Sequence, residues 1–279
     1  MRFLPLILVS LGTLFAESPN DRPWQILDAG MQDGNPAKRI DAVLAMGVIT
    51  REPRSIAALE AALNDKDSGV RQAAAATLGE LTARGSIPKL QDALSDSAPE
   101  VVFAAAKTLY EMGDPLGRQV LIAVLVGDQS DASGFVSSSV RDVKLKLHDP
   151  KALLLIGVNA GAGFALGPFG AGVPIAERLL KDNQASGKTA AALLLTTDTT
   201  EESKSAVKEA LGDKNWTVRV AAARATAIRG IGAFYPDIVA LMDDKRDEVR
   251  YSAAAAAIRL KQTPARAPRK AAAQPKPGA

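Results

Sequence analysis

Apolar and polar residues along this chain repeat with a period of about 31 residues, and each period contains two helical patterns. The second pattern is rich in alanine and follows an anchor valine, at Val70, Val101, Val218 and Val249. Apolar residues do not alternate with polar ones, so no strand is expected. Because one helix pair cannot bury a wide apolar face alone, successive pairs should stack. The pattern predicts an all-α solenoid, a superhelix of about seven two-helix repeats, over residues 23–262.

Two polar positions recur in the same register. Six of the seven copies carry an aspartate five residues before the anchor: Asp33, Asp65, Asp96, Asp182, Asp213 and Asp244. Six carry a basic residue directly after it: Arg39, Arg71, Arg141, Lys188, Arg219 and Arg250. Pro36, Ser68 and Pro99 are suited to the start of the second helix, and the aspartate falls in the turn before it.

The Asp-x-x-x-x-Val-Arg-x-Ala-Ala pattern resembles the HEAT-repeat family, in particular its short bacterial form, the PBS-lyase HEAT-like repeat. This resemblance implies that the aspartates and basic residues form a structural ladder between neighbouring repeats. Val102 replaces a basic residue and Phe135 an aspartate, so the ladder is expected to break around the third and fourth repeats. The alternative is that the arginines contact a ligand.

The ends of the chain and two long steps depart from the repeat. A charge-free, mostly apolar run from Phe3 to Ala16 follows Arg2, as in a secretory signal peptide, although an uncleaved anchor is an alternative. We therefore expect an exported protein, periplasmic or secreted. The expected organisation is a signal peptide at 1–16, a linker at 17–22, repeats at 23–262 with insertions near 127–136 and 157–173, and a disordered basic tail at 263–279.

The segment from Ala152 to Ala176 contains 25 residues and no charge, with Asn159 as its one polar side chain. Three interpretations remain open. It is a buried cap on the solenoid, a lid or docking site for an apolar ligand, or a membrane element. Dense glycine, with Pro168 and Pro174, disfavours a single membrane-spanning helix.

The sequence offers no candidate catalytic, cofactor-binding or metal-binding residue. There is no cysteine, and His148 is the only histidine, too few for a zinc or di-iron site. Deoxyhypusine hydroxylases and chromophore lyases are enzymatic relatives in the resembled family, but neither their paired His-Glu ligands nor a lyase residue can be assigned. Gly187-Lys188-Thr189 lacks the P-loop glycine, since Asp182 occupies that position. Without Arg2 and the six basic residues from Arg259 to the end, the chain has 27 basic and 31 acidic residues, which disfavours nucleic-acid binding.

These observations favour a non-enzymatic protein–protein interaction scaffold of the cell envelope, with a protein or peptide partner. Aromatic residues and arginine are frequent in interfaces, so the expected partner-binding residues are Trp216, Tyr251, Arg224 and Arg250. The alternative for Trp216 is packing on a neighbouring turn. Two other functions remain open: an enzyme or enzyme subunit of the PBS-lyase HEAT-like kind, and a membrane-associated assembly factor that uses residues 152–176.

Overall fold

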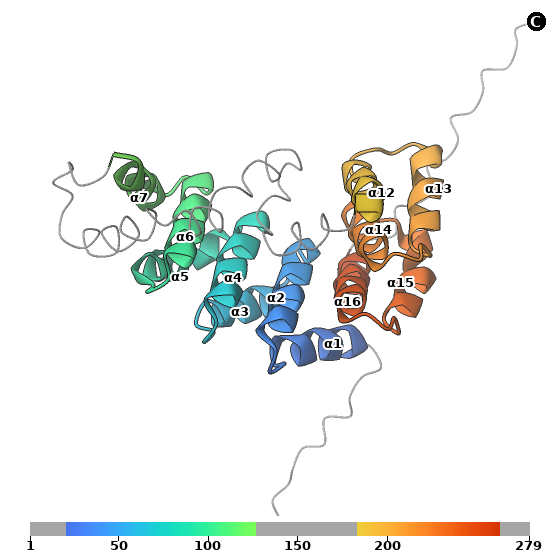
Figure 1. The fold of residues 1–279 in the computed structure, drawn as a ribbon, viewed down its shortest axis with the longest axis horizontal. Coiled ribbons are helices and arrows are strands. Elements are labelled where there is room, and N and C mark those ends of the chain that lie inside the picture. The colour runs from blue at the N-terminus through green and yellow to red at the C-terminus, as the bar shows by residue number, and fades with distance from the viewer. Residues whose placement is uncertain (1–20, 127–182, 263–279) are drawn as a thin grey trace, which may run out of the picture.

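The computed structural model describes residues 21–126 and 183–262, which form twelve α-helices and no strand (Figure 1). The first helices of the repeats are α1 (Arg22–Met31), α3 (Pro53–Ala62), α5 (Ile87–Asp92), α7 (Pro115–Val126), α13 (Glu201–Ala210) and α15 (Tyr235–Leu241). The second helices are α2 (Pro36–Ala45), α4 (Ser68–Glu80), α6 (Pro99–Glu111), α12 (Asn183–Leu194), α14 (Trp216–Arg229) and α16 (Asp247–Gln262). The predicted all-α solenoid is confirmed.

Several sequence predictions concern residues outside the described ranges. These are the signal peptide at 1–16, most of the linker at 17–22, the insertions near 127–136 and 157–173, the apolar segment 152–176 and the tail at 263–279. Within the described part of the chain, no helix is both long enough and apolar enough to cross a membrane.

The turn inside each repeat explains why the second helix begins where it does. The Asp65 carboxylate accepts a hydrogen bond from the Asp67 backbone N–H at 2.8 Å, which closes a tight turn. The Asp67 carboxylate then accepts from the Val70 N–H at 3.2 Å and caps the first turn of α4. In the other described turns, the backbone N–H two residues after the aspartate donates an equivalent bond to the aspartate carboxylate. The aspartates concerned are Asp33, Asp96, Asp213 and Asp244.

Alanine lets the second helices approach one another closely. Ala75 and Ala106 have no exposed surface, and neither do Leu78 and Leu109, which fill the space between layers. The Thr108 hydroxyl on α6 donates to the Ala75 carbonyl oxygen of α4 at 3.1 Å. The predicted stacking of the alanine-rich helices is confirmed, and leucine fills the seam between them.

The spatial order of the repeats differs from their order in the sequence. Helix α16, the last described helix, packs against both α1 and α2 of the first repeat. Helices α7 and α12, which follow each other among the described helices, lie at opposite ends of the molecule (Figure 1). The second helices are therefore stacked in the order α12, α14, α16, α2, α4 and α6. We call the contact of α16 with α1 and α2 the junction.

Candidate protein-binding surface

The recurring arginines and aspartates join neighbouring repeats. Arg39 on α2 donates from Nε and Nη2 to the two carboxylate oxygens of Asp65 in the next repeat, both at 2.8 Å. Its Nη1 donates to the Asp33 carbonyl oxygen of its own repeat at 2.8 Å. The same three bonds recur around Arg71 with Asp96, and around Arg219 with Asp244. One guanidinium thus fixes the spacing of two successive turns.

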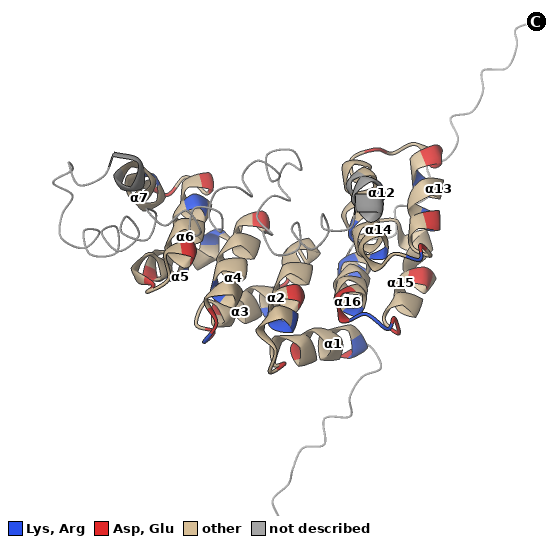
Figure 2. Ribbon diagram, in the orientation of Figure 1, with Lys and Arg blue, Asp and Glu red and all other residues tan. Residues whose placement is uncertain are grey.

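The ladder carboxylates are partly buried and remain charged. Burial by itself would raise the pKa of Asp65, but hydrogen bonds from Arg39 and from the Asp67 N–H outweigh it, so that the pKa is lowered. The pKa values of Asp96 and Asp244 are lowered by the same balance of effects. Figure 2 shows acidic and basic residues at the starts of the second helices, where these bonds form.

The ladder weakens towards both ends of the stack. Lys188 on α12 reaches Asp213 through a single contact of 2.8 Å, and the lysine side chain is 68% exposed. On α6, Val102 replaces the arginine and is buried, so the described ladder stops at Asp96. Asp182, Arg141 and Phe135 lie outside the described residues.

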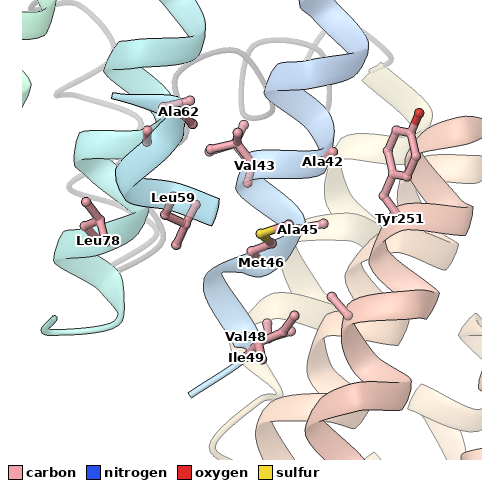
Figure 3. Close-up of a cluster of buried hydrophobic side chains, with 14 of the residues drawn as sticks. Ala42, Val43, Ala45, Met46, Val48, Ile49, Leu59, Ala62, Leu78 and Tyr251 are labelled. Carbon is pink, nitrogen blue, oxygen red and sulfur yellow. The ribbon is translucent and has the colours of Figure 1, made fainter. Parts of the chain in front are cut away.

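An aromatic side chain from the last repeat fills the junction. Tyr251 on α16 is 5% exposed and lies beside Ala42 of α2 (Figure 3). On α1, Gly30 makes room for it, since a Cβ atom there would lie 2.6 Å from Tyr251 Cε1 and 2.8 Å from the Ala42 Cβ. Burial is the main cause that raises the pKa of Tyr251. The junction is therefore a packed core between residues more than 200 positions apart.

Polar contacts surround this core. Arg224 on α14 donates to Glu80 on α4 at 2.7 Å, although 144 residues separate them in the sequence. Further contacts across the junction include Gln262 with Glu52 at 3.2 Å, Lys38 with Asp247 at 3.2 Å, and Arg22 with Asp243. The two halves of the described chain thus form one continuous stack.

HEAT repeats match residues 24–94, 69–133 and 173–259, which together are well over half of the chain. The chain belongs to the HEAT-repeat family. No curated protein sequence matches it.

Three solved structures have a similar helical fold. Human deoxyhypusine hydroxylase in complex with glycerol is 18% identical with a TM-score of 0.34, covering 87% of this chain and 98% of that one. The CpcE–CpcF complex of phycocyanin lyase from Nostoc sp. PCC7120 is 20% identical with a TM-score of 0.33, covering 91% and 97%. An engineered protein is 17% identical with a TM-score of 0.27, covering 87% and 97%. These similarities concern the fold alone and transfer no activity.

Most of the four residues expected to bind a partner are not free on the surface of the HEAT stack. The expectation for Tyr251 is wrong, because its ring is buried in the junction. Arg224 is ion-paired with Glu80, and Arg250 donates to the Asp247 carboxylate and the Asp244 carbonyl oxygen. Both arginines therefore have structural partners within the chain, which argues against a primary role in binding.

Trp216, the fourth expected residue, opens α14 and is partly exposed. The Arg246 guanidinium of the neighbouring turn lies 4.9 Å from the centre of its ring. This contact supports the alternative in which Trp216 packs on a neighbouring turn.

A different set of side chains is exposed. Among the described residues, the exposed large hydrophobic side chains are Tyr110 (54%), Ile122 (50%), Leu194 (64%) and Ile228 (38%). All four lie on helices of the outer repeats: α6 and α7 at one end, α12 and α14 at the other. We call Tyr110 with Ile122, and Leu194 with Ile228, the two distal surfaces. They are the candidate protein-binding surface of this HEAT stack.

Residue size at the repeat position of Tyr110 does not mark these surfaces in the sequence. Tyr110 occupies the repeat position that holds Gly47 and Gly79 in the first two repeats. At Gly79 a Cβ atom would lie 2.9 Å from the Thr108 hydroxyl of the next repeat, so a small residue is needed there. Within the described residues no further second helix follows α6 in the stack, and Tyr110 is 54% exposed there. Ile258 is equally large at the same repeat position of the last repeat but is buried, so residue size at this position does not by itself indicate exposure.

The described residues contain no cluster of three or more His, Asp or Glu side chains suited to a metal ion. His148 lies outside the described ranges.

Proposed function

We propose that this HEAT-repeat protein is a non-catalytic scaffold of the cell envelope that binds a protein or peptide partner through its distal surfaces. The observation that carries the proposal is the concentration of exposed large hydrophobic residues on the outer repeats. Tyr110, Ile122 and Leu194 are each at least half exposed, whereas the large apolar residues of the central helices α1 to α4 and α16 are buried or partly buried. Exposed large apolar residues are available for contact with a partner, and tyrosine is frequent among residues that dominate binding energy.

The use of the charged residues also favours a scaffold. Arg39, Arg71 and Arg219 each donate at least three hydrogen bonds to neighbouring turns, and those bonds lower the pKa values of their aspartate partners. Such a ladder stabilises the stack and leaves the outer surface to bind. The envelope location rests on the apolar leader at residues 1–16. Cell fractionation should place the protein in the periplasm or the medium, and recovery from the cytosol would contradict export.

Site-specific cross-linking tests the binding surface directly. A photoreactive amino acid is placed at Tyr110 or Leu194, and at Ala61 on α3 as an exposed control away from both distal surfaces. We expect the same partner to cross-link from both Tyr110 and Leu194 and not from Ala61. Equal labelling from all three positions, or none from the distal ones, would contradict the proposal.

Affinity for that partner gives a second measurement. Tyr110→Ser and Leu194→Ser should each weaken binding at least tenfold, since truncating a dominant interface residue costs about 2 kcal/mol or more. Lys89→Ser on α5, also exposed, is the matched control and should bind like wild type. Melting temperatures of all three variants should stay close to that of wild type, because these side chains contribute little to the core.

A further inference from the structure

We propose that the junction between α16 and the first repeat is a hinge in the HEAT stack, about which the two halves of the described chain can rotate apart. The Arg224–Glu80 ion pair, which we call the strut, restrains this rotation. The proposal is independent of any partner. It depends on how the polar contacts at the junction differ from those at the other interfaces between repeats.

The ladder is interrupted at the junction. At the regular interfaces, an arginine such as Arg219 donates two bonds to the aspartate of the next repeat, with the arginine and aspartate side chains 9% and 11% exposed. At the junction, Arg250 instead donates to Asp247 of its own helix. Lys38, whose side chain is 40% exposed, makes single contacts with Asp33 at 3.3 Å and Asp247 at 3.2 Å. An exposed lysine bridge restrains geometry less than a two-bond arginine contact. This edge of the junction is therefore held more weakly than its neighbours.

The ion pair restrains the opposite edge. Arg224 lies on α14 and Glu80 ends α4, and in the stack these two helices are separated by α16 and α2. Their 2.7 Å contact spans two intervening helices, so it forms only while the stack is curved enough to bring the ends of α14 and α4 together. Rotation of the two halves away from each other about the junction must break it.

Gly47 provides the space for this strut. A Cβ atom at Gly47 would lie 2.4 Å from Glu80 Oε2 and 3.5 Å from Arg224 Nη2. The carboxylate therefore rests directly on the 3-10 turn η2 (Met46–Val48) that follows α2. A methyl group at this position would displace the carboxylate without changing any charge.

The local electrostatics of α4 disfavour a carboxylate at the position of Glu80. As the last residue of α4 it places a negative charge at the negative end of the helix dipole, which is unfavourable. Its favourable interaction comes from Arg224 in the other half of the chain. The apolar contacts around Tyr251 keep the two halves together, while the polar edges set the angle between them.

Spin-label distances test the strut in the full chain, which has no cysteine to interfere. One label pair, at Lys89→Cys on α5 and Ser205→Cys on α13, spans the junction. The second pair, at Lys89→Cys and Ala57→Cys on α3, lies within one half; all three positions are exposed. The distance distribution of each label pair is measured by pulsed electron–electron double resonance. The measurement is made in the otherwise wild-type chain and in chains that carry Glu80→Gln or Arg224→Gln.

We expect both neutral variants to give the cross-junction pair a broader distribution with a longer-distance component. The pair within one half should not change. Lys107→Gln is the matched control, because it removes the exposed Lys107–Glu111 pair on the single helix α6. It should leave both distributions as in wild type.

Gly47→Ala provides an independent perturbation, and should widen the cross-junction distribution as Glu80→Gln does. It also serves if either charge variant fails to fold. An unchanged cross-junction distribution in the folded variants would overturn the proposal. So would equal broadening of both label pairs, or a response to Lys107→Gln as large as the response to Glu80→Gln.

Discussion

Replacing Arg71 with glutamine tests how much the ladder stabilises the stack. The Arg71 and Asp96 side chains are 14% and 12% exposed, and two bonds of 2.7 and 2.8 Å join them. A third bond of 2.8 Å reaches the Asp65 carbonyl oxygen. The substitution leaves Asp96 with the backbone N–H of Ala98 as its remaining bond from the turn, in a partly desolvated site.

The expected loss follows from these contacts. A hydrogen bond to a charged group contributes about 1.5–3 kcal/mol, and removing one partner of a fully buried ion pair costs about 3–5 kcal/mol. Water still reaches part of the Arg71–Asp96 pair, and the bonds are not additive. We therefore expect Arg71→Gln to lower the free energy of unfolding by about 2–4 kcal/mol.

Lys188→Gln is the matched comparison because Lys188 occupies the same repeat position. Its single contact with Asp213 is made by a mostly exposed side chain, so solvent and salt screen it. We expect a free energy of unfolding close to that of wild type. Both variants are measured by urea unfolding with circular dichroism. Hydrogen exchange of the α4 and α6 amides shows whether the loss is local, since repeat stacks can unfold in stages. Equal losses for the two variants would refute the reasoning, because partial burial and two-bond geometry would then contribute nothing.

Three further predictions follow from the packing and the charges. Gly30→Ala should lower stability by about 1–3 kcal/mol through overpacking against Tyr251. Gly34→Ala, where a Cβ meets nothing within 4 Å, should cause little change in thermal unfolding. Leu78→Ala should lower the free energy of unfolding in urea by about 2–5 kcal/mol because it leaves a cavity. Leu194→Ala should stay within about 0.5 kcal/mol of wild type, and similar losses for the two variants would contradict the assigned burial. Because the folded state lowers the pKa of the ladder aspartates, their stabilising contribution should be complete above about pH 4 and lost as the pH falls further. A free energy of unfolding that increases as the pH is lowered below about 4 would contradict this prediction.

Features that depend on information local to one repeat agree best between sequence and structure. Pro36, Ser68 and Pro99 were expected to begin second helices, and α2, α4 and α6 begin at them. A proline at the first helical position loses no backbone hydrogen bond, so its effect does not depend on the rest of the fold. The contacts of Arg39 and Arg71 with the following aspartates also lie between repeats that are adjacent in both sequence and space.

The proposed binding surface could be predicted less well, because exposure depends on which repeats are neighbours. Tyr251 follows its anchor valine in the same way as Phe103 and was expected at the surface. It is buried because α1 and α2 pack over it. Tyr110 is exposed on α6, after which no second helix is described before residue 183.

Spacing within a repeat of about 31 residues is enough to specify the helix pairs, their alanine-rich seams and the positions of the ladder residues. It does not specify that α16 stacks on α1 and α2, with α7 and α12 at opposite ends, which follows from the three-dimensional packing. Because similar repeats present similar faces, a local pattern does not select one partner face over another. That selection comes from particular side chains meeting across the fold: Tyr251 beside Gly30, and Arg224 with Glu80 over Gly47.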